Sequence, residues 1–535
     1  MQAFGVSCQG GLNTNLNEFQ MLEQPGFATE LENFEVDPDG GYRRINGYTL
    51  LGEDNAVRPN SANDILGLFV YADGVIACSG TNIYFTLDGE SWLQINRSSV
   101  SGSGDNYSTF TGRSTAARTS QGQASFALFE GSSIYGEVVI TDKGSGVKPA
   151  LFKMTGTGAL TDRTFFYEEI TVSGTHYPKF CTIHDKHLVV AGAATALNTI
   201  FYSGTSDIND FTSSGSGSIV LDDQVVGLKS FRGDLIIFCK NSIYKLSDIN
   251  ISASIAITPI TKNVGCLDGH SIQEIGGDLI FLSPDGLRLV AGTARIGDVE
   301  LSSVSRNIQS VISALAANID SYVITSAVLR SKSQYRLFYS STLELAVTSK
   351  GIIGTITPRG FEWSETVGIQ AHGFASGFNY SNVEKIYHGD NAGYVYNHNT
   401  GFDFNPAGTS TDIDARYKSP NLDFGDSGTL KSLHYTKISF TPEGTVQPIL
   451  KISYDFDSTD RPQPPIYTLD SIPTPAIFST GLFGTAVFGA SKDPMIKQAV
   501  QGSGHNIAFK IFSQDKKAPY SINGFYVDYR PSGRR

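Results

Sequence analysis

The sequence of 535 residues has little charge, few sulfur-containing side chains and no long apolar run. Charged residues make up 17 % of the chain, against about 25 % in an average globular domain. No apolar stretch approaches the ~18 residues of a membrane-spanning helix, and the first five residues lack the basic and apolar regions of a signal peptide. We therefore expect neither membrane insertion nor secretion by this chain.

The cysteines also lack the spacing of a metal or redox site. All five stand singly, at positions 8, 78, 181, 239 and 266, and none belongs to a CxxC pair. Three of them lie in or beside apolar, strand-like stretches. This pattern predicts reduced, buried thiols in a protein made in the cytoplasm.

Basic residues are in deficit. The 40 Lys and Arg side chains face 52 Asp and Glu, which gives a net charge of −12. Proteins that hold nucleic acid by its phosphates are usually basic, so the composition excludes a protein that grips DNA over its whole surface. The same composition is compatible with an acidic surface past which DNA slides.

The sequence contains a hairpin pattern that repeats along the chain. Arg232-Gly233-Asp234 precedes one apolar run and Gly276-Gly277-Asp278 precedes another, and each run is followed by a short polar turn and a second strand-like run. Looser copies begin near 75, 188, 337 and 386, and from 188 onward the steps are 47, 44, 58 and 49 residues. A period of ~40–50 residues with several strands in each repeat is typical of a β-propeller. We predict about seven blades, within a range of six to eight.

The position of the repeats divides an all-β chain into three sections. Residues 1–60 form an N-terminal arm and a hairpin around Asp37–Gly41, and residues 61–407 form the propeller, with a loop insertion at 96–124. Apolar residues 308, 311, 312 and 315 predict one helix between blades, with Ser302 or Ser303 as its N-cap. Residues 408–535 alternate polar and apolar with period two, which predicts a β-sandwich-like platform domain.

Candidate sites are incomplete. Thr86–Trp92 resembles the aspartate box of sialidase-like propellers, His184 and His187 form an isolated pair, and Asp455–Asp460 resembles part of a calcium loop without its Gly and Glu. The RGD tripeptide at 232 is explained by the blade turn. Because GxxxxGK[ST], HExxH and GxSxG are also missing, we expect a structural or binding role, with no catalytic centre, metal or cofactor.

Three groups of segments carry a family resemblance. The first comprises Gly10–Asn13, Pro25–Ala28, Asn33–Phe34 and Asp39–Tyr48; the second comprises Ile200–Gly204, Asp207–Phe211, Phe231–Phe238, Val264–Cys266, Asp285–Leu287 and Gly297–Ser302; the third comprises Gly502–Gly504 and Pro519–Phe525. Together they resemble the tail nozzle proteins of short-tailed bacteriophages, also called tail tubular or tail stabilisation proteins. The stretch 96–178 has no counterpart in that resemblance.

The resemblance implies a structural protein of the virion. Such nozzles form a hexameric ring below the portal and the adaptor, the head-to-tail connector protein. Tail fibres or spikes attach to the ring, and genomic double-stranded DNA passes through it non-specifically during ejection. The alternative is a receptor- or glycan-binding propeller of the virion or, less favoured, a glycan hydrolase.

The arm supplies the residues expected to build the assembly. It carries apolar side chains without a core of its own, and their burial requires either a neighbouring subunit or the C-terminal sandwich. These side chains are Leu12, Leu16, Phe19, Met21, Leu22, Phe27, Leu31 and Phe34.

Overall fold

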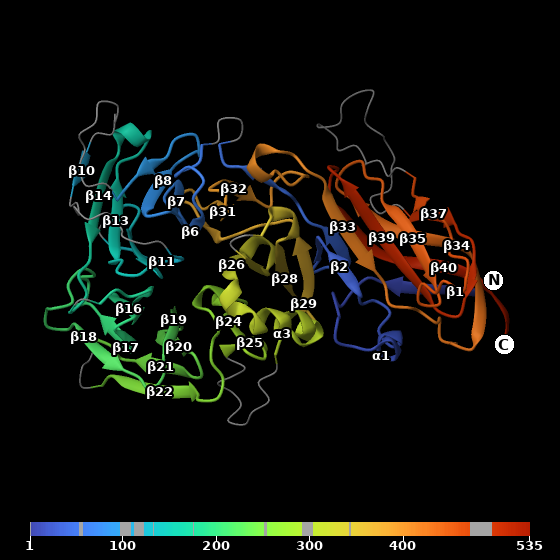
Figure 1. The fold of residues 1–535 in the computed structure, drawn as a ribbon, viewed down its shortest axis with the longest axis horizontal. Coiled ribbons are helices and arrows are strands. Elements are labelled where there is room, and N and C mark those ends of the chain that lie inside the picture. The colour runs from blue at the N-terminus through green and yellow to red at the C-terminus, as the bar shows by residue number, and fades with distance from the viewer. Residues whose placement is uncertain are drawn as a thin grey trace.

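A computed structural model of the chain describes residues 2–52, 57–96, 109–111, 122–131, 133–174, 176–250, 254–290, 303–341, 344–470 and 495–534. They form two all-β parts that lie side by side, a propeller and a two-sheet platform (Figure 1). One N-terminal strand, β2 (Glu30–Glu32), lies between these parts and pairs with a strand of each (Figure 1). The expected architecture is confirmed.

Seven sheets stand around one axis in the described part of the chain. Each contributes one inner strand next to the axis, and these are β6 (Ile65–Tyr71), β11 (Ala124–Phe129), β15 (Phe180–His184), β19 (Val225–Phe231), β23 (Gln273–Ile275), β26 (Val323–Leu329) and β30 (Gly373–Phe378). Most neighbouring inner strands contact each other around the axis, and β30 contacts β6 to close the circle. Beside β23, the short helix η3 (Gly269–Ser271) contacts both β19 and β26. The count lies within the predicted range of six to eight blades.

Most of the remaining blade strands step outward as consecutive antiparallel hairpins, as in β15–β18, whereas β10 pairs with β14 in parallel. Six of the sheets place four or five strands around the axis, and β23–β25 has three. The outer strands are β7 (Gly74–Ser79), β8 (Asn82–Thr86), β9 (Leu93–Gln94), β10 (Thr109–Thr111), β12 (Glu137–Asp142), β13 (Ala150–Thr155), β14 (Thr164–Glu169), β16 (His187–Ala193), β17 (Ala196–Tyr202), β18 (Gly217–Val220), β20 (Asp234–Cys239), β21 (Ile243–Ser247), β22 (Ala256–Thr261), β24 (Asp278–Ser283), β25 (Gly286–Leu289), β27 (Gln334–Ser340), β28 (Lys350–Thr357), β29 (Gly360–Val367), β31 (Glu384–Gly389) and β32 (Val395–His398).

The recurring tripeptides occupy equivalent turns between the first two strands of their blades. Arg232 and Gly233 adopt φ values of 52° and 83°, and Gly276 and Gly277 adopt 61° and 76°. Glycine takes this left-handed conformation without steric cost, which explains why the turn recurs. The Arg232 guanidinium donates to the Gly277 carbonyl at 2.5 Å, so the turn interpretation of the RGD tripeptide is confirmed.

The N-terminal segment completes both parts of the fold. Its strand β5 (Tyr48–Leu50) is the outermost strand of the last blade, where it pairs with β32. Strand β2 (Glu30–Glu32) pairs with β29 on one side and with β33 (Ile413–Lys418) on the other. The blade that begins with β26 therefore continues into the platform as one nine-stranded sheet.

The platform consists of two sheets. The first continues from β33 through β39 (Ile507–Asp515), β35 (Ile449–Tyr454) and β36 (Tyr467–Thr468). The second contains β1 (Gln2–Ser7), β3 (Phe34–Val36), β4 (Tyr42–Arg44), β34 (Thr429–Pro442), β37 (Met495–Ala499), β38 (Ser503–Gly504) and β40 (Tyr520–Arg534). Along β34 Ile438 and Phe440 are buried while Tyr435 is exposed, as the period-two pattern predicts.

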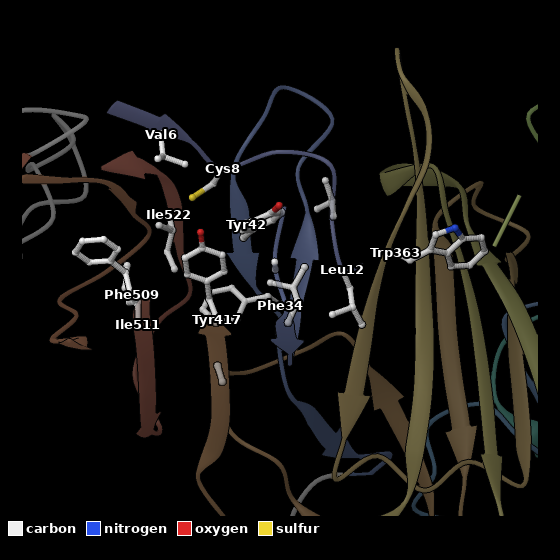
Figure 2. Close-up of a cluster of buried hydrophobic side chains, with 14 of the residues drawn as sticks. Val6, Cys8, Leu12, Phe34, Tyr42, Trp363, Tyr417, Phe509, Ile511 and Ile522 are labelled. Carbon is white, nitrogen blue, oxygen red and sulfur yellow. The ribbon is translucent and has the colours of Figure 1, made fainter. Parts of the chain in front are cut away.

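One hydrophobic cluster joins the propeller to the platform (Figure 2). Trp363 of β29 is fully buried, and its indole N–H donates to the Val304 carbonyl at 2.7 Å. Gly11 passes so close to β29 that a Cβ at that position would lie 2.7 Å from the Trp363 carbonyl oxygen. Side chains from the N-terminal segment and the platform complete the part of the cluster that Figure 2 labels: Val6, Cys8, Leu12, Phe34, Tyr42, Tyr417, Phe509, Ile511 and Ile522.

The helices agree in part with the expectations. Helix α3 (Gln309–Ala317) connects two blades as predicted, with Ile312 and Leu315 buried, and follows a short helix η4 (Arg306–Ile308). The predicted serine N-cap is wrong for Ser303, because the helical turns begin at 306 and the Ser303 hydroxyl pairs with that of Ser305. Ser302 lies outside the described residues.

The arm contains a helix that the sequence did not predict. Helix α1 (Glu18–Leu22) lies within the predicted arm, and Asn17 and Gln20 form a capping box at its start. The other short helices are η2 (Leu160–Asp162), η5 (Ile319–Ser321), η6 (Arg330–Lys332), η7 (Ala346–Thr348) and η8 (Pro406–Gly408). Most of the predicted insertion at 96–124 lies outside the described residues. No helix in the described part is long and apolar enough to cross a membrane.

All five cysteines are buried and none forms a disulfide, which confirms the prediction of core thiols. Burial raises the pKa of Cys8 and of Cys181 to about 12. A protonated thiol is a poor nucleophile and a poor metal ligand.

Substitutions of two apolar residues in the N-terminal arm, Leu12 and Phe19, should differ sharply in their effect on the free energy of unfolding. Leu12 is 1 % exposed and Phe19 is 81 % exposed. Leu12→Ala leaves a cavity in the shared core and should lower the free energy of unfolding by about 2–5 kcal/mol. Phe19→Ala, its control, should change it by less than about 0.5 kcal/mol. Denaturant unfolding measures both, and equal losses would contradict this assignment of the arm.

Candidate functional site: the propeller–platform junction and the axial channel

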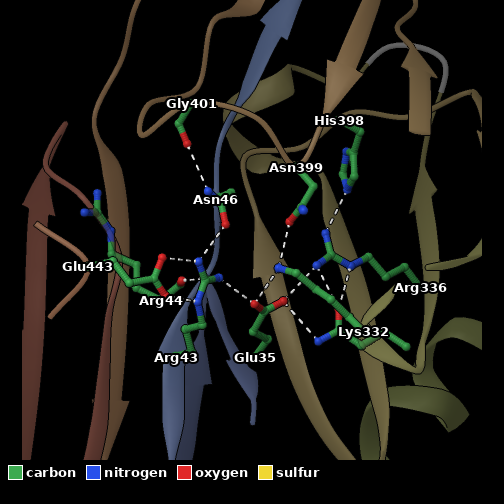
Figure 3. Close-up of polar contacts among 11 residues, drawn as sticks. Glu35, Arg43, Arg44, Asn46, Lys332, Arg336, His398, Asn399, Gly401 and Glu443 are labelled. Atoms are coloured by element: carbon green, nitrogen blue, oxygen red, sulfur yellow. Dashed lines mark hydrogen bonds and ion pairs between the residues drawn. The ribbon is translucent and has the colours of Figure 1, made fainter. Parts of the chain in front are cut away.

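A buried carboxylate stands at the junction (Figure 3). Glu35 of β3 is 2 % exposed and lies between three cations. Arg43 and Lys332 each approach one of its oxygens at 2.7 Å, and Arg336 approaches the other at 2.9 Å. Gln334 donates a further hydrogen bond to the second oxygen at 3.0 Å. Strand β3 is thereby fixed to β27 of the propeller.

The same hairpin is fixed to the platform by its two arginines. Arg43 forms a second ion pair with Glu443, at 2.5 and 2.7 Å. Arg44 is 1 % exposed; it pairs with the Asp515 carboxylate at 2.9 Å and donates to the Lys517 carbonyl at 2.6 Å. The β3–β4 hairpin therefore holds the propeller with Glu35 and the platform with Arg43 and Arg44.

Electrostatics decides the ionisation state of the cluster. Burial by itself raises the pKa of Glu35, but the charges of Lys332, Arg336 and Arg43 outweigh it and bring the pKa to about 2. Burial lowers the pKa of Lys332 to about 8. Glu35 is therefore ionised at neutral pH, and its charge is neutralised within the protein.

Two histidines extend the cluster into the last blade. Arg336 can only donate, so His398 accepts its hydrogen bond through Nε2, at 2.9 Å. The proton of His398 then lies on Nδ1 and is directed to Nδ1 of His388 at 3.2 Å. Burial lowers the pKa of both rings, that of His388 to about 3, and both are neutral.

The predicted assembly residues fall into two groups. Leu12, Met21 and Phe34 are buried within the protein itself, as is the neighbouring Leu31. Leu16, Leu22 and Phe27 are partly exposed, and Phe19 on α1 is 81 % exposed. The chain's own junction is thus the acceptor for the buried group, which stabilises the subunit. A role between subunits stays a prediction for the exposed group.

The propeller axis holds a channel of about 310 Å³. Residues from all seven inner strands line it. One mouth lies where the inner strands end and their first hairpins begin, and there the lining includes Phe69, Phe126, Lys229, Glu274, Arg330 and Ser376. Burial lowers the pKa of Lys229, while the charge of Glu274 opposes that change.

The sequence contained a weak signal for two of these residues. Lys229 stands three residues before the turn that begins at Arg232, and Glu274 stands two residues before the turn that begins at Gly276. A charged residue in an inner strand points to a solvent-filled axis. Glu35 carried a similar signal, because it interrupts the apolar pair Phe34 and Val36.

The partial motifs serve the structure. Thr86 and Asp88 accept main-chain hydrogen bonds within the turn after β8, and the indole of Trp92 donates to the Val57 carbonyl at 2.7 Å. Asp455 accepts from the main-chain N–H groups of His505 and Asn506 and pairs with Arg461 at 2.7 Å.

The two histidines of the isolated pair have separate partners. His184 contacts the Ser230 hydroxyl at 2.9 Å, and His187 contacts the Asn250 side chain at 3.0 Å. Within the described residues, no group of three or more His, Cys, Asp or Glu side chains is arranged to hold a metal ion.

Comparisons with known proteins give similarity of fold only. No family model and no curated protein matches the chain. An exo-β-1,3-galactanase from Phanerochaete chrysosporium is similar at 9 % identity over 91 % of this chain and 100 % of its own, with a TM-score of 0.27. A glycoside hydrolase family 43 arabinoxylan arabinofuranohydrolase from Bacillus subtilis is similar at 9 % identity over 90 % of this chain and 99 % of its own, with a TM-score of 0.25. The Pan2 WD40 domain of Neurospora crassa is similar at 8 % identity over 63 % of this chain and 90 % of its own, with a TM-score of 0.35.

These comparisons correct one expectation from the sequence. The inference that the chain is not an enzyme is contradicted, because two of the similar structures are glycoside hydrolases. That inference relied on missing sequence motifs. Glycoside hydrolysis commonly uses two carboxylates that meet only in the folded protein, so a search for local motifs does not exclude it.

Removing the charge of Glu35 should destabilise the protein strongly. Glu35→Gln leaves the buried Arg336 and the largely buried Lys332 without their ion-pair partner, while Arg43 keeps Glu443. We expect this change to cost about 3–5 kcal/mol at neutral pH. Glu443→Gln is the control in the same network, because Glu443 is 42 % exposed; its cost should stay below about 1 kcal/mol. Denaturant unfolding compares the two, and an unchanged midpoint for Glu35→Gln would contradict the assignment.

The pH dependence has a defined sign. Folding lowers the pKa of Glu35 from 4.5 to about 2. Its contribution of about 3 kcal/mol is complete above pH 4.5 and disappears as the pH falls through 2. The stability difference between the wild type and Glu35→Gln should therefore shrink across that window.

Proposed function

We propose that this protein is a structural subunit of the tail nozzle of a short-tailed bacteriophage virion. Subunits form a homo-oligomeric ring, expected to be hexameric, that attaches to the adaptor and carries tail fibres or spikes. Genomic double-stranded DNA passes through the ring without sequence-specific contacts. The observation that carries the proposal is the place in the fold of the segments that resemble nozzle proteins.

The first of these segments builds the junction. Gly10 donates to the Glu362 carboxylate at 2.7 Å, and Asn33 bridges β29 and β33 by donating to the carbonyls of Val367 and Asp414. Gly47 lies against Asp403 so closely that a Cβ would be 1.7 Å from its carbonyl oxygen. The resemblance thus involves residues that set the angle between propeller and platform, the geometry on which a ring of such subunits depends.

The platform offers surfaces for contact between copies. Among the described residues β37 pairs only with β34, and β36 only with β35, so each has an open edge. Tyr435, Met495 and Tyr526 lie on the outer face of three adjoining strands and are 36 %, 52 % and 53 % exposed. Open strand edges and exposed aromatic side chains favour association.

Ring formation is the direct test. Native mass spectrometry and negative-stain images of the purified chain should show a homo-oligomeric ring of six copies. Phe19→Glu should shift the mass towards the monomer without lowering the unfolding midpoint. Phe456→Glu is the control, because Phe456 is 55 % exposed on a platform loop far along the chain from the arm. A wild type that stays monomeric would contradict the proposal, and a ring unaffected by Phe19→Glu would remove the arm from it.

A protein through which DNA passes should bind that DNA only weakly. The net charge of −12 repels phosphates, so the protein should bind duplex DNA no more tightly than the ordinary non-specific range of ~10⁻⁴–10⁻⁶ M in ~150 mM salt. Fluorescence anisotropy with two unrelated duplexes measures this affinity. Nanomolar binding, or a preference for one duplex, would contradict passive passage.

A further inference from the structure

The two ends of the axial channel differ in how their charges are satisfied. At the end where the inner strands begin, Lys143 pairs with Asp268 at 2.8 Å and His372 contacts Asp64 at 3.4 Å. At the opposite mouth, Lys229, Glu274 and Arg330 form no side-chain hydrogen bond or ion pair with another described residue. The charges at the first end are therefore paired within the protein. The opposite mouth places two cations and one carboxylate at the channel without such partners, and of these Lys229 is partly buried.

The other half of this mouth is aromatic. The rings of Phe69 and Phe126 stack across two blades at 5.3 Å and face the channel. The hairpin after β30 then crosses the neighbouring blade, where the main-chain N–H of Tyr380 donates to the Ala72 carbonyl and its ring meets Tyr135 at 5.2 Å. Tyr380 remains 59 % exposed.

Arg330 connects the charged half to the aromatic half. Its guanidinium lies 5.7 Å from the ring of Phe378, which is 52 % exposed. A ligand at this mouth would therefore meet a cation and an aromatic face together. Exposed aromatic side chains beside a channel are characteristic of binding sites rather than of a solvated surface.

The channel wall calls for a ligand rich in hydroxyl groups. Every inner strand pairs with a single neighbour in its own blade, so its axial edge presents main-chain N–H and C=O groups outside the sheet ladder. Some of these groups are already engaged, because Gln273 and Ser376 donate to the carbonyls of Ser326 and Val328; the side chain of Thr182 also lines the wall. The volume of about 310 Å³ is at the lower end for a small-molecule site.

We propose that this mouth binds a carboxylated sugar unit, such as a hexuronic acid of an acidic polysaccharide. Lys229 and Arg330 hold the carboxylate by charge-assisted hydrogen bonds, and the aromatic rings pack against the C–H face of the sugar, to which their negative faces are attracted. The sugar hydroxyls exchange water for the main-chain groups of the wall. The inference does not depend on ring formation, so its failure would leave the nozzle proposal untouched.

Calorimetric titration of the full chain tests the site with matched ligands. The probes are a disaccharide that contains glucuronic acid, the same disaccharide with glucose in its place, and inorganic phosphate. We expect the acidic disaccharide to bind at least about tenfold more tightly than the neutral one, because charged hydrogen bonds carry that discrimination. Raising the salt concentration should weaken binding of the acidic disaccharide.

Variants separate this site from other basic residues of the same face. Lys229→Met and Arg330→Gln should each weaken binding of the acidic disaccharide about tenfold or more, with an unchanged unfolding midpoint. Lys186→Met is the control, because Lys186 is an exposed lysine in an equivalent blade turn outside the channel lining. Tyr380→Ala should weaken both disaccharides, which reports the stacking contribution independently of charge.

Four results would overturn the proposal. They are no binding of the acidic disaccharide, equal affinity for the acidic and neutral disaccharides, binding that neither Lys229→Met nor Arg330→Gln changes, and phosphate binding as tight as that of the acidic disaccharide. The last result would identify an anion site without sugar recognition.

Discussion

The buried ion cluster around Glu35 determines how the two halves of the molecule are joined. A carboxylate and three cations are costly to remove from water, and that cost is offset only if their geometry is kept. Glu35 reaches Lys332 and Arg336 in the propeller, while Arg43 reaches Glu443 in the platform. Any rotation between the parts separates opposite charges in a poorly solvated region. The cluster therefore fixes the angle as well as the contact.

The connection is non-local, which has consequences for folding. Strand β5 closes a blade whose other strands lie more than 300 residues later, and β1 pairs with β40 near the C-terminus. Neither the last blade nor the platform is complete until both ends of the chain have met. Contacts of such long sequence separation slow folding, because the loop entropy is lost before the contact is gained. Once formed, they leave the junction without a free N-terminal segment.

The repeat made the propeller predictable, because each hairpin is encoded locally by a turn and two apolar runs. The alternation along β34 and β39 likewise predicted a sheet with one buried face. The arm was not predictable in this way. Leu12 and Phe19 are both apolar residues of one polar-rich stretch, yet one enters the shared core and the other stays in solvent. Their difference is set by partners such as Trp363, several hundred residues away, so no local pattern encodes it.

The same limit applies to charge. In sequence, Glu35 and Glu274 are both single acidic residues in the middle of a three-residue strand, but the fold gives Glu35 three cationic partners and leaves Glu274 facing an open channel. Only 17 % of the residues in this chain are charged. Nearly every buried charge at the junction is paired with an opposite charge. Against that background, unpaired charges at one mouth of the axis are the exception. Pairing within the subunit identifies charges that hold the fold, and its absence beside a channel identifies those available to a ligand.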